Sequence, residues 1–226
     1  WHYQAYDVIE VAKKIKAVSP DTCIILGGLT ASYFAREIMR DYDAIDFIIA
    51  GDGERGLLEL SQALREQRSD FSGIANCLYR KDGKVFDNGI TYLADPVEFS
   101  EIEYANLGYL DHYESYRDYF KVPLFWLLNA SIQENMRQKI SGATSTFPLM
   151  VGRGCNVNCS FCGGGQAAQK KICGRKQAVF MPIEKVVDTM EQALEYGYES
   201  FLICFDPNPY DDGYYLELFE EIRRRK

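Results

Sequence analysis

Three cysteines lie close together in this chain: Cys155, Cys159 and Cys162 occupy positions i, i+4 and i+7. Glycines flank them on both sides, so the loop is pliable enough for three thiolates to converge on one inorganic centre. Soft thiolate ligands select iron–sulfur or zinc centres over hard cations. An iron–sulfur cluster ordinarily takes four thiolates, so three indicate a cluster with one iron left open for a substrate.

Two other interpretations of the three cysteines stay open. A structural zinc site would need a fourth ligand, and Cys173 follows eleven residues after Cys162, but this spacing does not match a zinc ribbon or finger. The thiols could instead pack as small apolar groups, although the loop around them is polar and rich in glycine. The two histidines, His2 and His112, lie far away in the sequence and lack metal-motif spacing with the loop.

The chain has seven cysteines and no secretory signal, so a disulfide framework is not expected. Cys23, Cys77 and Cys204 lie in or beside apolar runs and are expected to be core thiols. Cys173 lies in the basic stretch 170–176 and could be either buried or solvated. That basic stretch is expected to be a solvated loop, although it could meet a carboxylate or phosphate.

A series of alternating strands and helices is expected to position the cysteine loop. The apolar pattern predicts strands over 22–26, 47–50, 147–151 and 200–205, and helices over 3–18, 31–41, 57–68, 182–195 and 214–224. Thr30 is the expected N-cap of the second helix, and Asp82-Gly83 is the expected turn of a hairpin at 77–86. This alternation predicts a parallel sheet with helices on both faces.

Composition limits the classes of function. Hydrophobic residues make up 47% and charged residues 26%, which is typical of a globular protein. The net charge of −8 argues against broad binding to nucleic acid or an anionic membrane. No apolar run approaches the ~20 residues that span a bilayer, so a cytoplasmic protein is expected. The chain opens on a helix without an initiator Met and ends after two βα units, so a fragment cut at both ends is expected.

The pattern Cys155-x-x-x-Cys159-x-Phe161-Cys162 resembles the signature of the radical S-adenosylmethionine (radical SAM) superfamily. The resemblance implies that the three cysteines bind a [4Fe–4S] cluster, whose open iron chelates the methionine part of S-adenosylmethionine. It further implies S-adenosylmethionine contacts from Phe161 near the adenine, from the close-approaching backbone of Gly163 and Gly164, and from Asp206 in the loop after the next strand.

A second pair of loops sharpens the resemblance. Gly27-Gly28 follows one predicted strand, and Gly51-Asp52-Gly53-Glu54 follows the next, at strand ends where α/β sheets bind ligands. Together with the cysteine loop, this layout resembles the cobalamin-binding radical SAM enzymes. The resemblance implies a cobalamin pocket lined by Gly27, Gly28, Thr30, Gly51, Gly53 and Glu54.

The resemblance also implies a fold and a division into domains. Residues 1–94 would form a partial flavodoxin-like (Rossmann-like) cobalamin-binding domain of the α/β class. Residues 95–146, rich in Tyr and Glu, would form a helical linker. Residues 147–226 would supply the first βα units of a radical SAM partial TIM barrel.

The implied activity is the reductive cleavage of S-adenosylmethionine to methionine and a 5′-deoxyadenosyl radical. Methyl transfer to an unactivated carbon through cobalamin is the expected outcome, although some members of the family carry out rearrangements. The expected partners are an electron donor such as ferredoxin or flavodoxin and a small-molecule or peptide substrate. Two alternatives remain: a corrinoid carrier with a structural metal loop that cleaves no S-adenosylmethionine, and a zinc-stabilised interaction domain.

Overall fold

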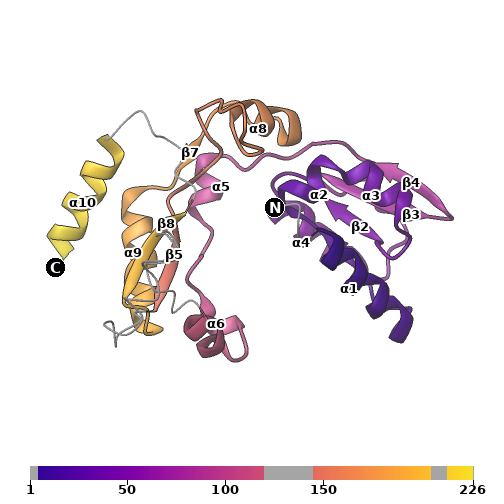
Figure 1. Ribbon diagram of the computed structural model, residues 1–226, viewed down its shortest axis with the longest axis horizontal. Helices are drawn as coiled ribbons and strands as arrows, with labels where there is room; N and C mark the ends of the chain where they lie inside the picture. Colours follow the sequence, from indigo (N-terminus) through magenta and orange to yellow (C-terminus); the bar gives the residue numbers. More distant parts are fainter. Residues whose placement is uncertain (1–4, 120–144, 205–212, 226) are drawn as a thin grey trace, which may run out of the picture. The chain divides into compact units, whose positions relative to one another are not determined.

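The computed structural model describes residues 5–119, 145–204 and 213–225 (Figure 1). By its internal contacts the chain divides into two compact units. The first comprises Trp1–Asp95 and Val157–Gln177, and the second comprises Pro96–Asn156 and Ala178–Lys226. The cysteine loop therefore spans a boundary between units, and the three predicted domains stay a prediction.

The first unit is built on a four-stranded sheet in the order β1-β2-β3-β4. Its strands are β1 (Ile25–Leu26), β2 (Phe47–Ile49), β3 (Cys77–Lys81) and β4 (Lys84–Asp87). The β1–β2 pair is parallel, as predicted, but β2–β3 and β3–β4 are antiparallel, so the sheet is mixed. The hairpin between β3 and β4 is confirmed, and both residues of its Asp82-Gly83 turn have positive φ.

Helices cover both faces of this sheet, as predicted. The unit contains α1 (Ala5–Val18), α2 (Gly28–Tyr33), α3 (Ala35–Asp41), α4 (Glu54–Arg65) and α8 (Gln166–Cys173). Ile48 faces α1, α2 and α3, whereas its neighbours Phe47 and Ile49 face Leu60 of α4. This alternation follows from the two-residue period of a strand. Full burial of Ile48 or Leu60 contributes about 1.5–3 kcal/mol.

The helix that follows β1 differs from the prediction. It is broken at Phe34 into α2 and α3, and it begins three residues earlier than expected. Its N-cap is Gly27, which makes no side-chain capping bond. Thr30 therefore lies inside α2 and is not the N-cap, because the strand ends at Leu26 and the chain turns into the helix at the two glycines.

The second unit pairs β5 (Thr146–Met150) with β8 (Ser200–Cys204) in parallel, from Thr146 opposite Ser200 to Met150 opposite Cys204. Two short strands, β6 (Gly152–Arg153) and β7 (Val179–Phe180), pair antiparallel. The helical elements are α5 (Pro96–Ser100), η1 (Leu107–Tyr109), α6 (Tyr113–Tyr119), α9 (Ile183–Glu195) and α10 (Gly213–Arg225).

The core of the second unit lies between its parallel strands and its helices. Leu149, Val186 and Leu218 are almost fully buried there and come from β5, α9 and α10. The two βα units agree with the predicted elements, and the barrel that they would begin stays a prediction. The predicted linker is helical in α5 and α6, and its residues 120–144 lie outside the described residues. Within the described ranges, no helix is long and apolar enough to cross a membrane.

Candidate functional site

A cavity of about 410 Å³ opens at the carboxyl ends of β1 and β2 in the first unit. Five of the six residues predicted to contact cobalamin line it together: Gly27, Gly28, Gly51, Gly53 and Glu54. The apolar side chains of Ile25, Leu26, Ile49 and Leu57 complete its wall. The sheet therefore brings together two glycine loops that lie about one βα unit apart in the sequence, as expected for strand ends at one edge.

The hydroxyl of Ser32 joins the two glycine loops. Its Oγ accepts a hydrogen bond from the Gly51 amide and donates one to the Gly28 carbonyl, both at 2.8 Å. Gly28 and Gly51 both have positive φ, at 83° and 69°, where glycine is favoured. One half-buried serine therefore fixes the separation of the two loops that line the cavity. Sequence reasoning did not assign Ser32 a role, although it lies in the Gly27–Ser32 run.

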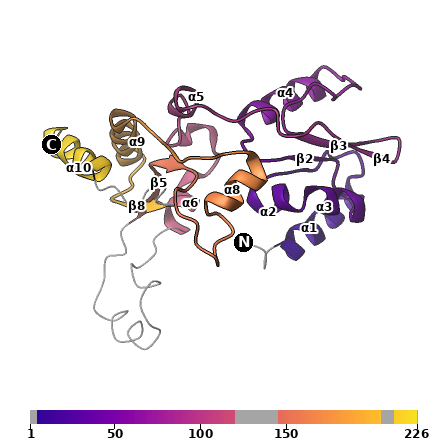
Figure 2. The same ribbon diagram turned by 90° about the horizontal axis from the view of Figure 1, so that it is seen from above.

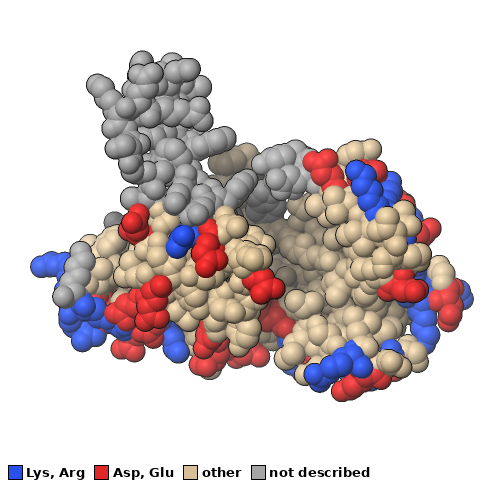
Figure 3. Space-filling view, turned by 90° about the horizontal axis from the view of Figure 1, so that it is seen from below, with Lys and Arg blue, Asp and Glu red and all other residues tan. Residues whose placement is uncertain are grey.

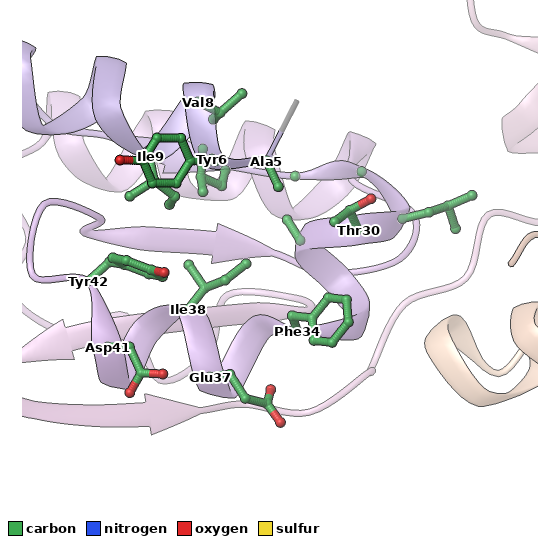
Figure 4. Close-up of a pocket in the computed structure, with 15 residues that line it drawn as sticks. Ala5, Tyr6, Val8, Ile9, Thr30, Phe34, Glu37, Ile38, Asp41 and Tyr42 are labelled. Carbon is green, nitrogen blue, oxygen red and sulfur yellow. The ribbon is translucent and has the colours of Figure 1, made fainter. Parts of the chain in front are cut away.

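A second cavity, of about 600 Å³, lies between α1 on one side and α2 and α3 on the other. Figure 4 shows Ile9 and Tyr6 of α1 facing Phe34 and Ile38 across it. Thr30, the sixth residue predicted to contact cobalamin, lines this cavity. Leu26, Gly27 and Gly28 line both cavities, so they form the wall that the two share.

The cysteine loop folds into tight turns within the first unit. The Cys162 amide donates to the Cys159 carbonyl at 3.2 Å, and the Gln166 amide donates to the Val157 carbonyl at 2.9 Å. The Gly164 amide points at Cys162 Sγ, 3.4 Å away. Amide hydrogen bonds to cysteine sulfur are among the interactions that set the potential of iron–sulfur clusters. The loop backbone is therefore suited to a sulfur ligand at Cys162.

The three loop cysteines are reduced, and all lie at least partly at the surface. Cys155 and Cys159 are half-buried and Cys162 is exposed. Cys155 belongs to the second unit and the other two to the first. In the part of the chain that the structure describes, no three His, Cys, Asp or Glu side chains are grouped closely enough to hold a metal ion. Their assignment as one ligand set therefore stays a prediction from their spacing.

The residues predicted to contact S-adenosylmethionine also lie on this loop. The Phe161 side chain is 90% exposed. A Cβ at Gly163 would have no heavy atom within 4 Å, so the backbone there faces open space. Gly164 lies beside it, with its amide on Cys162 Sγ. Asp206 lies outside the described residues.

The remaining cysteines differ in exposure. Cys77 is fully buried in the core, as predicted, and burial is the main cause that raises the pKa of its thiol to about 12. The expectation for Cys23 is wrong: Cys23 is exposed, because it precedes β1 and takes no place in the strand ladder. Cys173 is buried, and its thiol donates to the Gln169 carbonyl at 3.1 Å. The side chain of Cys204 lies outside the described part of the structure.

The basic stretch 170–176, which begins in the last turns of α8, is partly buried. Arg175 is buried, and its guanidinium forms an ion pair with Asp52 in the loop between β2 and α4. Lys171 lies on α8, where its Nζ donates to Tyr33 Oη at 3.1 Å. These contacts hold α8 against α2 and the Asp52 loop (Figure 2). Sequence reasoning missed the Asp52–Arg175 pair.

Charged side chains of both signs lie on the surface. On the face drawn in Figure 3, acidic and basic side chains are intermixed. Several charges are paired locally, for example Arg36 with Asp87 at 2.8 Å. Such exposed pairs are typical of a solvated surface and contribute little to stability.

Two solved structures of similar fold are S-adenosylmethionine radical enzymes. TsrM from Kitasatospora setae, a radical S-adenosylmethionine methyltransferase solved with cobalamin and a [4Fe–4S] cluster bound, matches 98% of this chain with a TM-score of 0.62 and 17% identity. OxsB, a cobalamin-dependent S-adenosylmethionine radical enzyme, matches 86% with a TM-score of 0.52 and 16% identity. The chain covers 37% and 22% of these two structures.

Two curated relatives of this chain carry enzyme names. An uncharacterised methyltransferase from Pyrococcus horikoshii is 25% identical over 85% of this chain. The anaerobic magnesium-protoporphyrin IX monomethyl ester cyclase of Rubrivivax gelatinosus is 27% identical over 99%. The chain spans 35% of the length of each of these two proteins. No family model matches the chain.

The fold is thus the α/β arrangement found in cobalamin-dependent radical SAM enzymes, and the predicted fold class is confirmed. The predicted resemblance to that class is confirmed as well, since solved enzymes of this class share the fold over most of the chain.

Proposed function

We propose that this chain is part of a radical SAM enzyme that reductively cleaves S-adenosylmethionine and uses cobalamin as a second cofactor. The observation that carries the proposal is the 410 Å³ cavity, because it joins the two glycine loops that the cobalamin-binding resemblance singled out. Support also comes from two enzymes that share the fold. TsrM is described with cobalamin and a [4Fe–4S] cluster bound, and OxsB with aqua-cobalamin and S-adenosylmethionine bound.

The lining of the cavity suits one part of a large, partly apolar cofactor. The backbone of Gly28 is open to a close approach, since a Cβ there would have no heavy atom within 4 Å, and Gly27, Gly51 and Gly53 line the same cavity. Leu26, Ile49 and Leu57 supply apolar surface that excludes water, and Glu54 supplies one carboxylate at the start of α4. We assign these groups to cobalamin. Thr30 lines the adjoining cavity, so a ligand that extends past the shared residues Gly27 and Gly28 would reach it.

We assign Cys155, Cys159 and Cys162 to a [4Fe–4S] cluster. The donor set fits, because three reduced cysteines on a glycine-rich loop match a cluster with one open iron. When bound, the cluster supplies the electron that cleaves S-adenosylmethionine. The chain's own contribution is to hold the thiols, to donate the Gly164 amide to Cys162 Sγ, and to offer Phe161 and Gly163 as an open surface for the adenosine and methionine parts. Asp206 is assigned to the same ligand from its place in the sequence.

The proposed outcome is methyl transfer to an unactivated carbon of a small molecule or peptide, with ferredoxin or flavodoxin as electron donor. The methyltransferase name of the Pyrococcus horikoshii relative supports this outcome. The cyclase name of the Rubrivivax gelatinosus relative marks ring closure as the competing reaction of the same class.

The test uses the full-length protein that contains this chain, reconstituted anaerobically with iron and sulfide. We expect about four irons per chain, with visible absorbance and an electron paramagnetic resonance signal after reduction. Cys155→Ala, Cys159→Ala and Cys162→Ala should each abolish the signal. Cys23→Ala is the matched control, since Cys23 is an exposed thiol outside the loop. An equal loss of iron from Cys23→Ala would count against the assignment.

A second measurement separates the enzyme from a corrinoid carrier. The reconstituted protein is incubated with dithionite and S-adenosylmethionine, and 5′-deoxyadenosine is quantified by mass spectrometry. Release that depends on all three cysteines supports the proposed enzyme. Cobalamin binding without any 5′-deoxyadenosine would indicate a carrier, and one zinc per chain without visible absorbance would indicate a structural zinc site.

A further inference from the structure

A buried ion pair ties the helix after the cysteine loop to the loop that lines the 410 Å³ cavity. Arg175, immediately after α8, is 3% exposed, and Asp52, between β2 and α4, is 4% exposed. They lie 123 positions apart in the sequence but within the same compact unit. Asp52 is flanked by Gly51 and Gly53, which both line the cavity. The pair therefore connects a cavity loop directly to the segment that carries Cys159 and Cys162.

The ion pair is embedded in a hydrogen-bonded junction. Asp52 Oδ2 accepts the Ala94 amide at 2.9 Å as well as Arg175 Nη2, and the same Nη2 donates to the Ala94 carbonyl at 3.2 Å. From the other side, Asn76 Nδ2 donates to the Asp52 carbonyl at 3.0 Å. The carboxylate and the backbone of Asp52 are thus both held, so the position of the loop depends on these partners.

The backbone of the cavity loop also touches α8 directly. A Cβ added to Gly51 would lie 2.7 Å from Cys173 Cβ, closer than real Cβ atoms approach. The last turn of α8 therefore rests on the Gly51 backbone, beside the ion pair. A shift of Gly51 or Asp52 is transmitted to α8 through both contacts, because packed interiors deform little.

Burial of an ion pair is not by itself a reason for stability, because the desolvation of both charges opposes their attraction. A well-packed apolar pair of similar volume would often stabilise the unit as well or better. An apolar pair would lack directional hydrogen bonds. Here one guanidinium donates both to Asp52 in the cavity loop and to the Ala94 carbonyl. This geometry favours a role in setting the relative position of the segments.

We propose that Asp52 and Arg175 are positioning residues that couple the occupancy of the cobalamin cavity to the order of the segment 157–177. This inference rests on the proposed function, because it takes cobalamin as the ligand of the cavity. A ligand against Gly51, Gly53 and Glu54 fixes the Asp52 loop, and the ion pair passes that restraint to α8 and the cysteine turns before it. By linkage, ordering of the cysteine segment favours cobalamin binding to the same extent.

The test is hydrogen exchange of the full-length protein, followed by mass spectrometry, with and without hydroxocobalamin. Cobalamin binding is measured separately by absorbance titration. In the wild type, we expect exchange in peptides covering 166–177 to slow by about tenfold on binding, within the usual range of coupling between sites. The double variant Asp52→Asn/Arg175→Met removes the pair without leaving one buried charge. By the same linkage it should bind hydroxocobalamin more weakly, with a dissociation constant raised by up to about tenfold. At saturating hydroxocobalamin it should lose the slowing in 166–177.

Two further variants keep the test decisive. Arg36→Met is the matched control, since it breaks an exposed Arg–Asp pair in the same unit and should leave both binding and slowing unchanged. Arg175→Lys keeps the charge, but its ammonium lies on a shorter side chain than Arg175 Nη2 and is more strongly hydrated, so it is less suited to the buried contacts with Asp52 and Ala94. It carries the same test if the double variant does not fold, and it should reduce the slowing.

The outcomes separate the two proposals. Binding of cobalamin without any slowing in wild-type 166–177 overturns the coupling and leaves the proposed function intact. Slowing that persists in a folded variant lacking the pair, or in Arg175→Lys at the wild-type level, also overturns the coupling. Absence of cobalamin binding to the wild type overturns the cobalamin assignment and the coupling with it.

Discussion

The amide of Gly51 donates a hydrogen bond to Ser32 Oγ at 2.8 Å, and the same hydroxyl donates to the Gly28 carbonyl. Two loops from successive βα units are thereby fastened to each other at the cavity. Ser32, in the second turn of the short helix α2, thus helps to set the shape of the cavity, although its own side chain does not line it.

Ser32→Ala tests this role. The substitution removes both hydrogen bonds and should lower the free energy of unfolding by about 1 kcal/mol. Because the loops are then less well held, we expect the dissociation constant of hydroxocobalamin for the full-length protein to rise by about five- to tenfold, measured by absorbance titration. Ser61→Ala is the control, since Ser61 also donates to a helix carbonyl, that of Leu57, but lies on α4 away from the glycine loops. Equal weakening by both would argue against the role of Ser32.

Gly51→Ala tests the contact between the cavity loop and α8. Both Gly51 and Gly83 have positive φ, so alanine at either position costs about 1–2 kcal/mol from the backbone alone. At Gly51 the new Cβ would also meet Cys173 Cβ, whereas at Gly83 it meets nothing within 4 Å. We expect Gly51→Ala to lower the free energy of unfolding by a further 1–3 kcal/mol, roughly, in urea denaturation.

Cys173→Gly should recover part of the Gly51→Ala loss, because the clash is with the Cβ of Cys173 and not with its sulfur. Cys173→Ala keeps that Cβ and should recover nothing. Similar losses from Gly51→Ala and Gly83→Ala would show that α8 does not rest on Gly51.

The elements and the glycine loops could be predicted because their signals are local. The apolar runs at Phe47–Ile49 and Thr146–Met150 fix strands by themselves, and a Gly-Gly after a strand marks a turn in any context. The exposure of Cys23 was misjudged because the apolar run continues before β1, while the paired strand begins only at Ile25. The apolar pattern of a sequence indicates a strand, but it does not indicate the residue at which the strand begins to pair with its neighbour.

The Asp52–Arg175 pair could not be predicted for a different reason. Asp52 and Arg175 are 123 positions apart in the sequence. The residues next to each of them do not distinguish a buried charge from a surface charge. Arg175 sits among lysines in a stretch that composition alone marks as solvated. Only the packing of α8 on the first unit buries it, and that packing depends on tertiary contacts that a single sequence does not reveal.

Cys77 makes the stability of the first unit sensitive to alkaline pH. Burial, followed by the charge of Cys23, raises the pKa of the Cys77 thiol from its ordinary 9.0 to about 12. The folded state therefore keeps this proton while the unfolded state releases it, and the stability present below about pH 9 is lost as the pH rises toward 12. Between those values the free energy of unfolding should fall by about 1.4 kcal/mol per pH unit from this group.

The measurement is urea denaturation under reducing, metal-free conditions at about pH 8 and about pH 10.5, for wild type and Cys77→Ala. The alkaline loss should be smaller in the variant, whose side chain does not titrate. Ile48→Val serves as the control, since it loosens the same sheet without removing a titrating group and should leave the alkaline loss unchanged. An equal alkaline loss in wild type and Cys77→Ala would refute the assignment of this pH dependence to Cys77.

Phe161 separates function from folding. Its side chain is 90% exposed, so Phe161→Ala removes almost no buried surface and should change the free energy of unfolding of the cluster-free protein by less than about 0.5 kcal/mol. The proposed contact with the adenine would be lost, however, and an aromatic stacking contact is worth about 1–3 kcal/mol. We therefore expect the reconstituted full-length protein to bind S-adenosylmethionine about tenfold more weakly by isothermal titration.

Tyr109→Ala is the control for Phe161→Ala, at a residue that is 88% exposed in the second unit. It should change neither the free energy of unfolding nor the binding of S-adenosylmethionine. If Phe161→Ala left S-adenosylmethionine binding unchanged, the adenine contact would have to come from another residue.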